Sequence, residues 1–376
     1  MSESLIYLDY NATTPVDPAV LDVMLPYLRE KFGNPSCSHP YGSDAKKAVE
    51  EARKKVANAI GCFPEEIIFT SGGTESNNLA IFGVTEALKD QGRHIITSKI
   101  EHPAVIEPMV ELIHRGFDVT FLPVDKNGLV DGGEIERLIR PDTILVSVMH
   151  ANNETGVIQP IKEIATITRA KGVVFHSDAA QSFGKIEVNV RELGVDLLSI
   201  AGHKTYAPKG IGALYVRRDT PIKRVIFGAG QERGIRPGTE PVAQIVALGE
   251  AAEMASKTVG EEIARLEKLR NMLEEGILAS TPNAVVHGKG APRLPNTLSI
   301  GFPGMSSAEL LGKMQNRIAA SAGAACHGNE PKISHVLEAM GVSPEVALGT
   351  IRLSLGRFTT EEEIRAAIDY FAGLFS

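Results

Sequence analysis

The sequence predicts an α/β protein with a mostly parallel sheet in a large domain and a smaller α+β domain. Two observations carry this prediction. Between residues 67 and 216, short apolar runs alternate with helical stretches, and most of these runs are continuously apolar rather than apolar at every second position. Such strands are buried on both faces, as in a parallel sheet covered by helices. The length of 376 residues also suits two packed domains.

The elements of the large domain follow in order. Residues 43–60 predict a helix, because apolar residues recur at helical spacing and Gly61 follows as a stop signal. A second helix is expected over 161–171. The predicted buried strands are 67–69, 95–96, 119–121, 144–146, 173–175, 197–200 and 214–216.

The pattern changes near residue 258. A charged connecting helix is expected over 261–275, and later helices begin at two capping-box pairs, Ser306 with Glu309 and Thr360 with Glu363. The last helix carries an apolar stripe of Ile364, Ile368 and Phe371, and strand-like runs lie at 296–302 and 351–355. We therefore expect a large domain of residues 15–257 and a small domain of residues 1–14 plus 258–376.

The net charge, the apolar runs and the cysteine count exclude several classes of partner and location. The net charge of −7 without a basic cluster argues against nucleic acid or a membrane surface as partner. The first residues lack the pattern of a signal peptide, and no run of about 18 apolar residues predicts a membrane span. Three widely spaced cysteines, Cys37, Cys62 and Cys326, predict neither disulfides nor a metal site. A reducing, cytoplasmic setting is expected.

The first strand of the sheet is followed by a small-residue loop, Ser71-Gly72-Gly73-Thr74-Glu75-Ser76-Asn77, which opens a helix. Small residues let an anion approach the backbone, and a helix N-terminus offers free N–H groups and a positive dipole end. The loop lacks the Walker spacing, so a single phosphate fits better than a nucleotide. The alternative is that these serine, glycine and threonine residues only cap the helix and bind no ligand.

Polar side chains also follow four other strands, at 101–103, 152–155, 176–181 and 201–204. In a parallel α/β sheet, ligands gather at the carboxyl ends of the strands. Any one of these loops is explained by polar groups that are hydrogen-bonded at a strand end. Four such loops at equivalent places indicate a ligand-binding site. The last loop projects Lys204 from a glycine turn, partly desolvated and close to the predicted anion site, where an amine can serve as a Schiff-base nucleophile.

Several motifs together resemble the class V aminotransferase fold, and more narrowly the NifS/IscS-type cysteine desulfurases. They are His176-Ser177-Asp178-Ala179-Ala180-Gln181, Gly202-His203-Lys204, Gly238-Thr239 and Ile351-Arg352-Leu353-Ser354-Leu355-Gly356-Arg357. The resemblance runs from residues 7–15 to residues 358–363, nearly the whole chain. It implies a pyridoxal 5′-phosphate enzyme of fold type I.

The resemblance also implies roles for single residues. Lys204, rather than the nearby Lys209, forms the Schiff base with pyridoxal phosphate and later moves the substrate α-proton. Asp178 pairs with the pyridine nitrogen and keeps the ring an electron sink. His102 is the third catalytic residue, which stacks on the ring and relays protons. Asn153 and Gln181 bond near its phenolic oxygen, and Gly73, Thr74 and His203 hold the phosphate.

Three further residues complete the implied site. Thr239 reaches the phosphate of the neighbouring subunit, which implies a homodimer. Arg352 clamps the substrate carboxylate, together with Asn153, a task suited to the guanidinium fork. Cys326 lies in a small, polar stretch expected to form an exposed loop; its thiolate attacks the substrate sulfur, leaving alanine and a persulfide for acceptors such as an Fe–S scaffold or tRNA thiolation. His327 either lowers the pKa of that thiol or is merely solvated.

Two departures from the family pattern leave questions open. Ala201 stands where a serine usually donates a hydrogen bond to the phosphate, which removes about 1 kcal/mol of cofactor binding. The run Ala324-Ala325-Cys326-His327 resembles selenocysteine lyases, so release of selenide from selenocysteine is the main alternative to cysteine desulfuration. Ordinary transamination and a non-enzymatic scaffold for sulfur-transfer partners are the remaining hypotheses.

Overall fold

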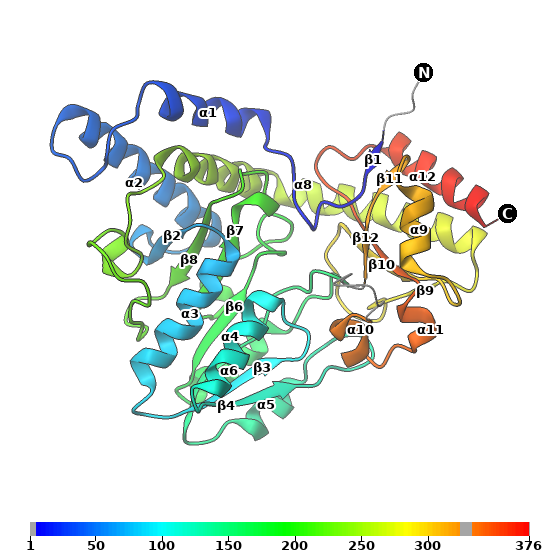
Figure 1. Cartoon of the computed structure of the whole chain (residues 1–376), viewed down its shortest axis with the longest axis horizontal. Coiled ribbons are helices and arrows are strands. Elements are labelled where there is room, and N and C mark those ends of the chain that lie inside the picture. Colours follow the sequence, from blue (N-terminus) through cyan, green and yellow to red (C-terminus); the bar gives the residue numbers. More distant parts are fainter. Residues whose placement is uncertain (1–4, 324–332, 376) are drawn as a thin grey trace.

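The computed structural model describes residues 5–323 and 333–375. Figure 1 shows two sheets, each with its own helices, and a long helix α8 (Val242–Ser280) that runs between them. The larger sheet has seven strands in the order β2-β8-β7-β6-β5-β3-β4. Their bounds are β2 (Ile67–Thr70), β3 (His94–Ser98), β4 (Asp118–Leu122), β5 (Thr143–Ser147), β6 (Val174–Asp178), β7 (Leu197–Ala201) and β8 (Gly212–Val216). All seven predicted strands are confirmed.

The large sheet is mostly parallel, as predicted. Strands β4, β3, β5, β6 and β7 pair in parallel, whereas β8 runs antiparallel to both of its neighbours, β7 and β2. Because the five parallel strands point the same way, their carboxyl ends meet at one edge. That edge carries four of the five polar loops, and the loop after β2 reaches the same side because β2 has the same direction as β7.

Helices cover both faces of this sheet, which explains its continuously apolar strands. Ile67 and Phe69 of β2 face one core cluster, and Ile68 between them faces another. The first cluster is completed by α2 (Pro40–Ile60), α6 (Ile161–Ala170) and the start of α8, the second by α3 (Gly73–Leu88) and α4 (Pro103–His114). Gly61 ends α2 in the left-handed conformation at φ 72°, as the sequence predicts.

One helix of 12 residues and several shorter elements complete this part. They are α1 (Pro18–Arg29), α5 (Gly132–Leu138), α7 (Val190–Leu193) and single 3-10 turns at Pro64–Glu66, Gly202–Lys204 and Glu232–Gly234. None of the helices in the described ranges is long and apolar enough to cross a membrane.

The second sheet has four strands in the order β12-β13-β10-β9, all paired antiparallel. They are β9 (Val285–Val286), β10 (Thr297–Gly301), β12 (Ser321–Ala322) and β13 (Thr350–Ser354); beside them β1 (Ile6–Tyr7) pairs in parallel with β11 (Ile318–Ala319). The helices here are α9 (Ser307–Met314), α10 (His335–Ala339), α11 (Pro344–Ala347) and α12 (Glu361–Leu374).

Two sequence expectations for this part have different outcomes. The Thr360–Glu363 capping box is confirmed at the start of α12. The Ser306–Glu309 capping box is wrong: α9 begins after Ser306, but the serine side chain makes no capping hydrogen bond.

The helix expected over residues 261–275 is only the second half of α8. Leu248, in its first half, packs in the core of the large sheet, whereas Leu269 and Leu273 pack against β10 and β13. One rigid element therefore contributes to both cores. The division into domains at residues 257 and 258 falls inside this helix and stays a prediction.

Candidate active site

A cavity of about 260 Å³ lies at the carboxyl edge of the large sheet. The polar loops that follow five strands contribute side chains to it, together with the N-terminal segment and β13. The lining residues include Asn11, Gly73, Thr74, Asn77, His102, Met149, Asn153, Asp178, Gln181, Ala201, His203, Lys204 and Arg352. All of the predicted site residues except Thr239, Cys326 and His327 thus come together in one place.

Lys204 ends the 3-10 turn that follows β7. Burial lowers the pKa of its amine to about 8, the carboxylate of Asp178 opposes that shift, and the cation of Arg352 adds to it. A substantial fraction of the amine is therefore neutral near pH 8, and the neutral form is the nucleophile toward an aldehyde.

Asp178 is the last residue of β6 and is only 5% exposed. Its Oδ2 accepts a hydrogen bond of 2.7 Å from Asn77 Nδ2, and its Oδ1 accepts one of 2.8 Å from the backbone N–H of Ala180. Two donors fix the carboxylate in the cavity wall. Sequence reasoning assigned no role to Asn77, although it lies one helical turn from Gly73 and Thr74.

His102 is the N-cap of α4, and its Nδ1 accepts a hydrogen bond of 3.1 Å from the N–H of Ala104. This contact assigns Nδ1 as the acceptor, so a proton on the neutral ring is carried by Nε2. Burial, and then the nearby Lys204, lower the pKa of His102. The preceding Glu101 is fully buried, which raises the pKa of its carboxyl to about 8.

The predicted anion site is formed by the start of α3 and by His203. A side chain at position 73 would place its Cβ 3.3 Å from the Cβ of Ala201, which also lines the cavity, so glycine keeps this space open. The ring of His203 contacts Thr13 Oγ1 at 3.1 Å through Nδ1. Burial and the neighbouring Lys204 lower the pKa of His203 to about 4, so its ring is neutral at pH 7.

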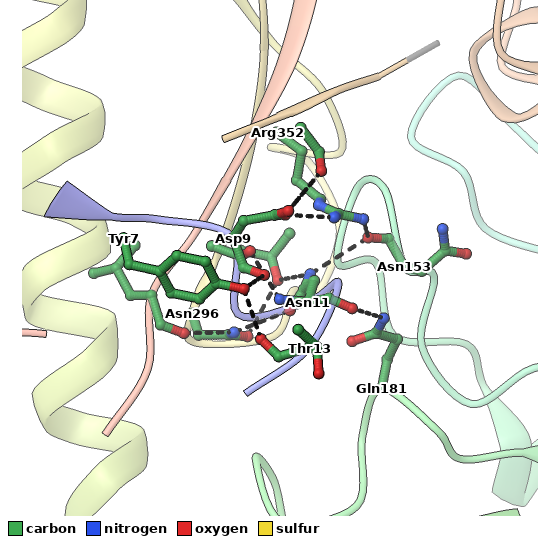
Figure 2. Close-up of polar contacts among 12 residues, drawn as sticks. Tyr7, Asp9, Asn11, Thr13, Asn153, Gln181, Asn296 and Arg352 are labelled. Carbon is green, nitrogen blue, oxygen red and sulfur yellow. Dashed lines mark hydrogen bonds and ion pairs between the residues drawn. The ribbon is translucent and has the colours of Figure 1, made fainter. Parts of the chain in front are cut away.

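Arg352 enters the cavity from β13 of the second sheet. Its Nη1 donates to the carbonyl oxygen of Asn153 at 2.9 Å, and its Nη2 donates to Asp9 Oδ1 at 2.7 Å (Figure 2). Asn153 itself lies in the loop after β5, so one guanidinium joins the two sheets at the cavity.

Asn11 is a second connection that sequence reasoning missed. Its Nδ2 donates to Thr297 Oγ1 at 2.8 Å, and its backbone oxygen accepts from Gln181 Nε2 at 3.0 Å (Figure 2). The buried Lys185 donates to both Asn11 Oδ1 and Gln181 Oε1, at 2.8 and 2.7 Å. Burial and the cation of Lys204 lower the pKa of Lys185 well below its usual range. The only signal in the sequence was the run from Tyr7 to Pro15, which carried the resemblance without a role for this residue.

Three predicted residues lie apart from the cavity. Thr239 is exposed and is absent from the described cavity lining, so its contact with a neighbouring subunit stays a prediction. Cys326 and His327 lie outside the described residues.

Comparison with known proteins bears directly on this site. The sequence profile of the family "Aminotransferase class-V" matches residues 6–367. The chain belongs to the aminotransferase class V family. Within it, the chain falls with the NifS/IscS-type cysteine desulfurases, which confirms the resemblance inferred from the motifs.

Individual members of this class V family illustrate the match. A protein of Dictyoglomus turgidum named cysteine desulfurase IscS is 47% identical over 365 residues, covering 97% of this chain and 93% of the relative. A solved NifS-like protein superposes with a TM-score of 0.92 at 40% identity and 99% coverage of both chains. The structure of SspA in complex with cysteine matches with a TM-score of 0.83 and 37% identity, over 94% of this chain and 100% of that one.

Cysteine desulfurases of the aminotransferase class V family depend on pyridoxal phosphate. The residues of this cavity fit that cofactor. Asp178 is a buried carboxylate fixed by two donors, and Lys204 is a desolvated amine in the same cavity. The helix N-terminus beside Gly73 provides an end suited to a phosphate.

Proposed function

We propose that this class V family member is a cysteine desulfurase that converts L-cysteine to L-alanine and places the sulfur on Cys326 as a persulfide. The observation that carries the proposal is the convergence of Lys204, Asp178 and Arg352 on one cavity. These three supply a nucleophilic amine, a carboxylate for a ring nitrogen and a cation for an amino-acid carboxylate. The names of the relatives, including one solved with cysteine, support the substrate.

Each residue then has a defined task. Pyridoxal phosphate, when bound, supplies an electron sink for the carbon that loses its proton. Lys204 would attach the cofactor and carry the substrate α-proton, Asp178 would hold a proton on the ring nitrogen, and His102 would stack on the ring. Gly73, Thr74 and His203 would hold the phosphate, Asn153 and Gln181 the phenolic oxygen, and Arg352 the substrate carboxylate.

The sulfur transfer needs no external oxidant, because the substrate carbon gains the electron pair that the sulfur loses. The Cys326 thiolate attacks the substrate sulfur, an S–S bond forms as the C–S bond breaks, and the released electron pair with a proton completes alanine. The proposal includes a homodimer in which Thr239 of each chain contributes to the other site. It also includes a cytoplasmic location and acceptor proteins such as an Fe–S scaffold or tRNA-thiolation partners.

Substitution of one lysine tests the proposal. In the presence of a thiol reductant, which cleaves the Cys326 persulfide and liberates its outer sulfur, wild type should release alanine and sulfide from L-cysteine in equal amounts. It should also show a visible absorption band that borohydride abolishes. Lys204→Ala should lose both properties, whereas Lys209→Ala, the exposed neighbouring lysine, should keep both. A keto acid in place of alanine and sulfide would mean transamination, and a colourless wild-type protein would indicate a scaffold.

A further inference from the structure

Among the described residues, the buried guanidinium of Arg352 has fewer hydrogen-bond acceptors than it has donors. Nη1 and Nη2 each have one partner, Asn153 and Asp9. The Nε donor is buried, and none of the described residues accepts a hydrogen bond from it. Nη1 and Nη2 each carry a second N–H bond for which no described residue is the acceptor, and Arg352 lines the cavity, so a ligand carboxylate can accept these two bonds side by side.

Asp9 lies beside Arg352 but is absent from the described lining of the cavity. Its Oδ1 and Oδ2 both accept from Ser321 Oγ at 2.9 Å, in addition to the 2.7 Å contact with Arg352 (Figure 2). Its backbone is also fixed, because Asp9 forms an isolated parallel β-bridge with Ser354 of β13. The carbonyl oxygen of Asp9 also accepts a hydrogen bond of 3.2 Å from Tyr7 Oη. The carboxylate is thus held from both sides.

We propose that Asp9 is a positioning residue that fixes the orientation in which Arg352 presents its free donors to the carboxylate of the amino-acid substrate. The inference rests on the proposed function in one respect, that Arg352 binds this carboxylate. Asp9 on Nη2 and the Asn153 carbonyl on Nη1 restrain the rotation of the guanidinium, so the remaining N–H bonds of Nη1 and Nη2 keep one direction. A preorganised donor loses less freedom when the ligand binds.

Two effects of Asp9 oppose each other. Its negative charge repels a second carboxylate at Arg352, while its hydrogen bond orients the donors. The Asp9 side chain is 18% exposed and that of Arg352 9%, so solvent screens the repulsion only in part, but the cation of Arg352, 2.7 Å from Asp9, offsets the negative charge that a substrate carboxylate meets. Orientation should therefore prevail, and the opposite sign of the two effects makes the inference testable.

Substitutions at Asp9 separate the two effects. We would measure KM and kcat with L-cysteine, and the dissociation constant of L-alanine from the change in cofactor absorption, for wild type, Asp9→Ala and Asp9→Asn. Asp9→Ala should raise KM and the alanine constant about tenfold, with kcat changed less than about threefold. Asp9→Asn keeps an acceptor oxygen for Arg352 and should show a smaller rise.

The matched control is Asp17→Asn. Asp17 pairs with Arg357 at 2.6 Å in a comparably buried ion pair, and neither residue lines the cavity as described. This variant should leave both constants unchanged. Ser321→Ala, which removes the second donor to Asp9, gives an independent test in case Asp9→Ala fails to fold, and it should raise both constants in the same direction.

Unchanged or lowered constants in folded, cofactor-loaded Asp9→Ala, or in Ser321→Ala where Asp9→Ala does not fold, would overturn the inference. A decrease in both Asp9 variants would mean that repulsion dominates. If wild type bound L-alanine but released no sulfide from L-cysteine, the proposed function would be wrong. The dissociation constants of L-alanine for wild type and the Asp9 variants would then still test the role of Asp9.

Discussion

Asn77 donates a hydrogen bond of 2.7 Å to Asp178, and both side chains are buried. The contact joins α3, whose start forms the predicted phosphate site, to the end of β6. It holds the carboxylate proposed to pair with the ring nitrogen, and a buried carboxylate is costly when a donor is lost.

Asn77→Leu should therefore lower the free energy of unfolding by about 1–3 kcal/mol and speed loss of the cofactor. Urea unfolding and the decay of cofactor absorption on dilution would measure the two effects. Asn78→Ala is the control, because Asn78 donates only to the backbone oxygen of its neighbour Thr74 at an exposed position. Equal effects of the two variants would contradict this role for Asn77.

His176 should make the protein less stable in mild acid. The ring is fully buried between Ser147 Oγ and Ser199 Oγ, at 2.8 and 3.0 Å, and burial lowers its pKa from 6.5 to about 4. Below pH 6.5 the unfolded chain binds a proton that the folded chain refuses, so stability falls as the pH falls from 6.5 toward 4.

Between pH 6.5 and 5 this one histidine accounts for about 1.6 kcal/mol. Urea unfolding at the two pH values should show His176→Gln losing less stability than wild type by roughly that amount. His150 and His287, whose pKa values burial also lowers to about 4, keep part of the dependence in the variant. An identical loss in wild type and variant would contradict the assignment.

Restoring a serine at position 201 should tighten cofactor binding. Ala201 is 3% exposed and lines the cavity next to Gly73. A hydroxyl there adds a donor toward the predicted phosphate position, worth about 1 kcal/mol or a roughly fivefold lower dissociation constant. Titration of cofactor-depleted Ala201→Ser with pyridoxal phosphate would measure it, and weaker binding would show that the site has no room for the hydroxyl.

Much of the large sheet could be predicted because its strands are buried on both faces and so differ sharply from the loops. The reversed direction of β8 could not, since an apolar run reads the same in either direction. The long α8 was predicted only in part: its first half is buried among other elements and lacks the one-sided pattern of an exposed helix.

The meeting of residues around one cavity could be predicted where a strand end or a family motif marked the residue, as for Lys204, Asp178 and Arg352, whose roles stay predictions. Asp9, Asn11 and Asn77 were missed because they act through contacts between segments far apart in the chain. Asn11 meets residues 286 and 170 positions away, and no local pattern encodes such a pairing.

The central claim is that Lys204 holds the cofactor while Cys326 takes the sulfur, and one comparison tests it most directly. Wild type and Cys326→Ala would be incubated with L-cysteine and with L-selenocysteine in the presence of a thiol reductant that frees persulfide sulfur, and alanine measured together with sulfide or selenide. We predict that Cys326→Ala keeps the borohydride-sensitive absorption and loses sulfide release from cysteine. If wild type released selenide far faster than sulfide and Cys326→Ala kept that activity, the result would favour a selenocysteine lyase. Sulfide release at the wild-type rate by Cys326→Ala would contradict the persulfide mechanism.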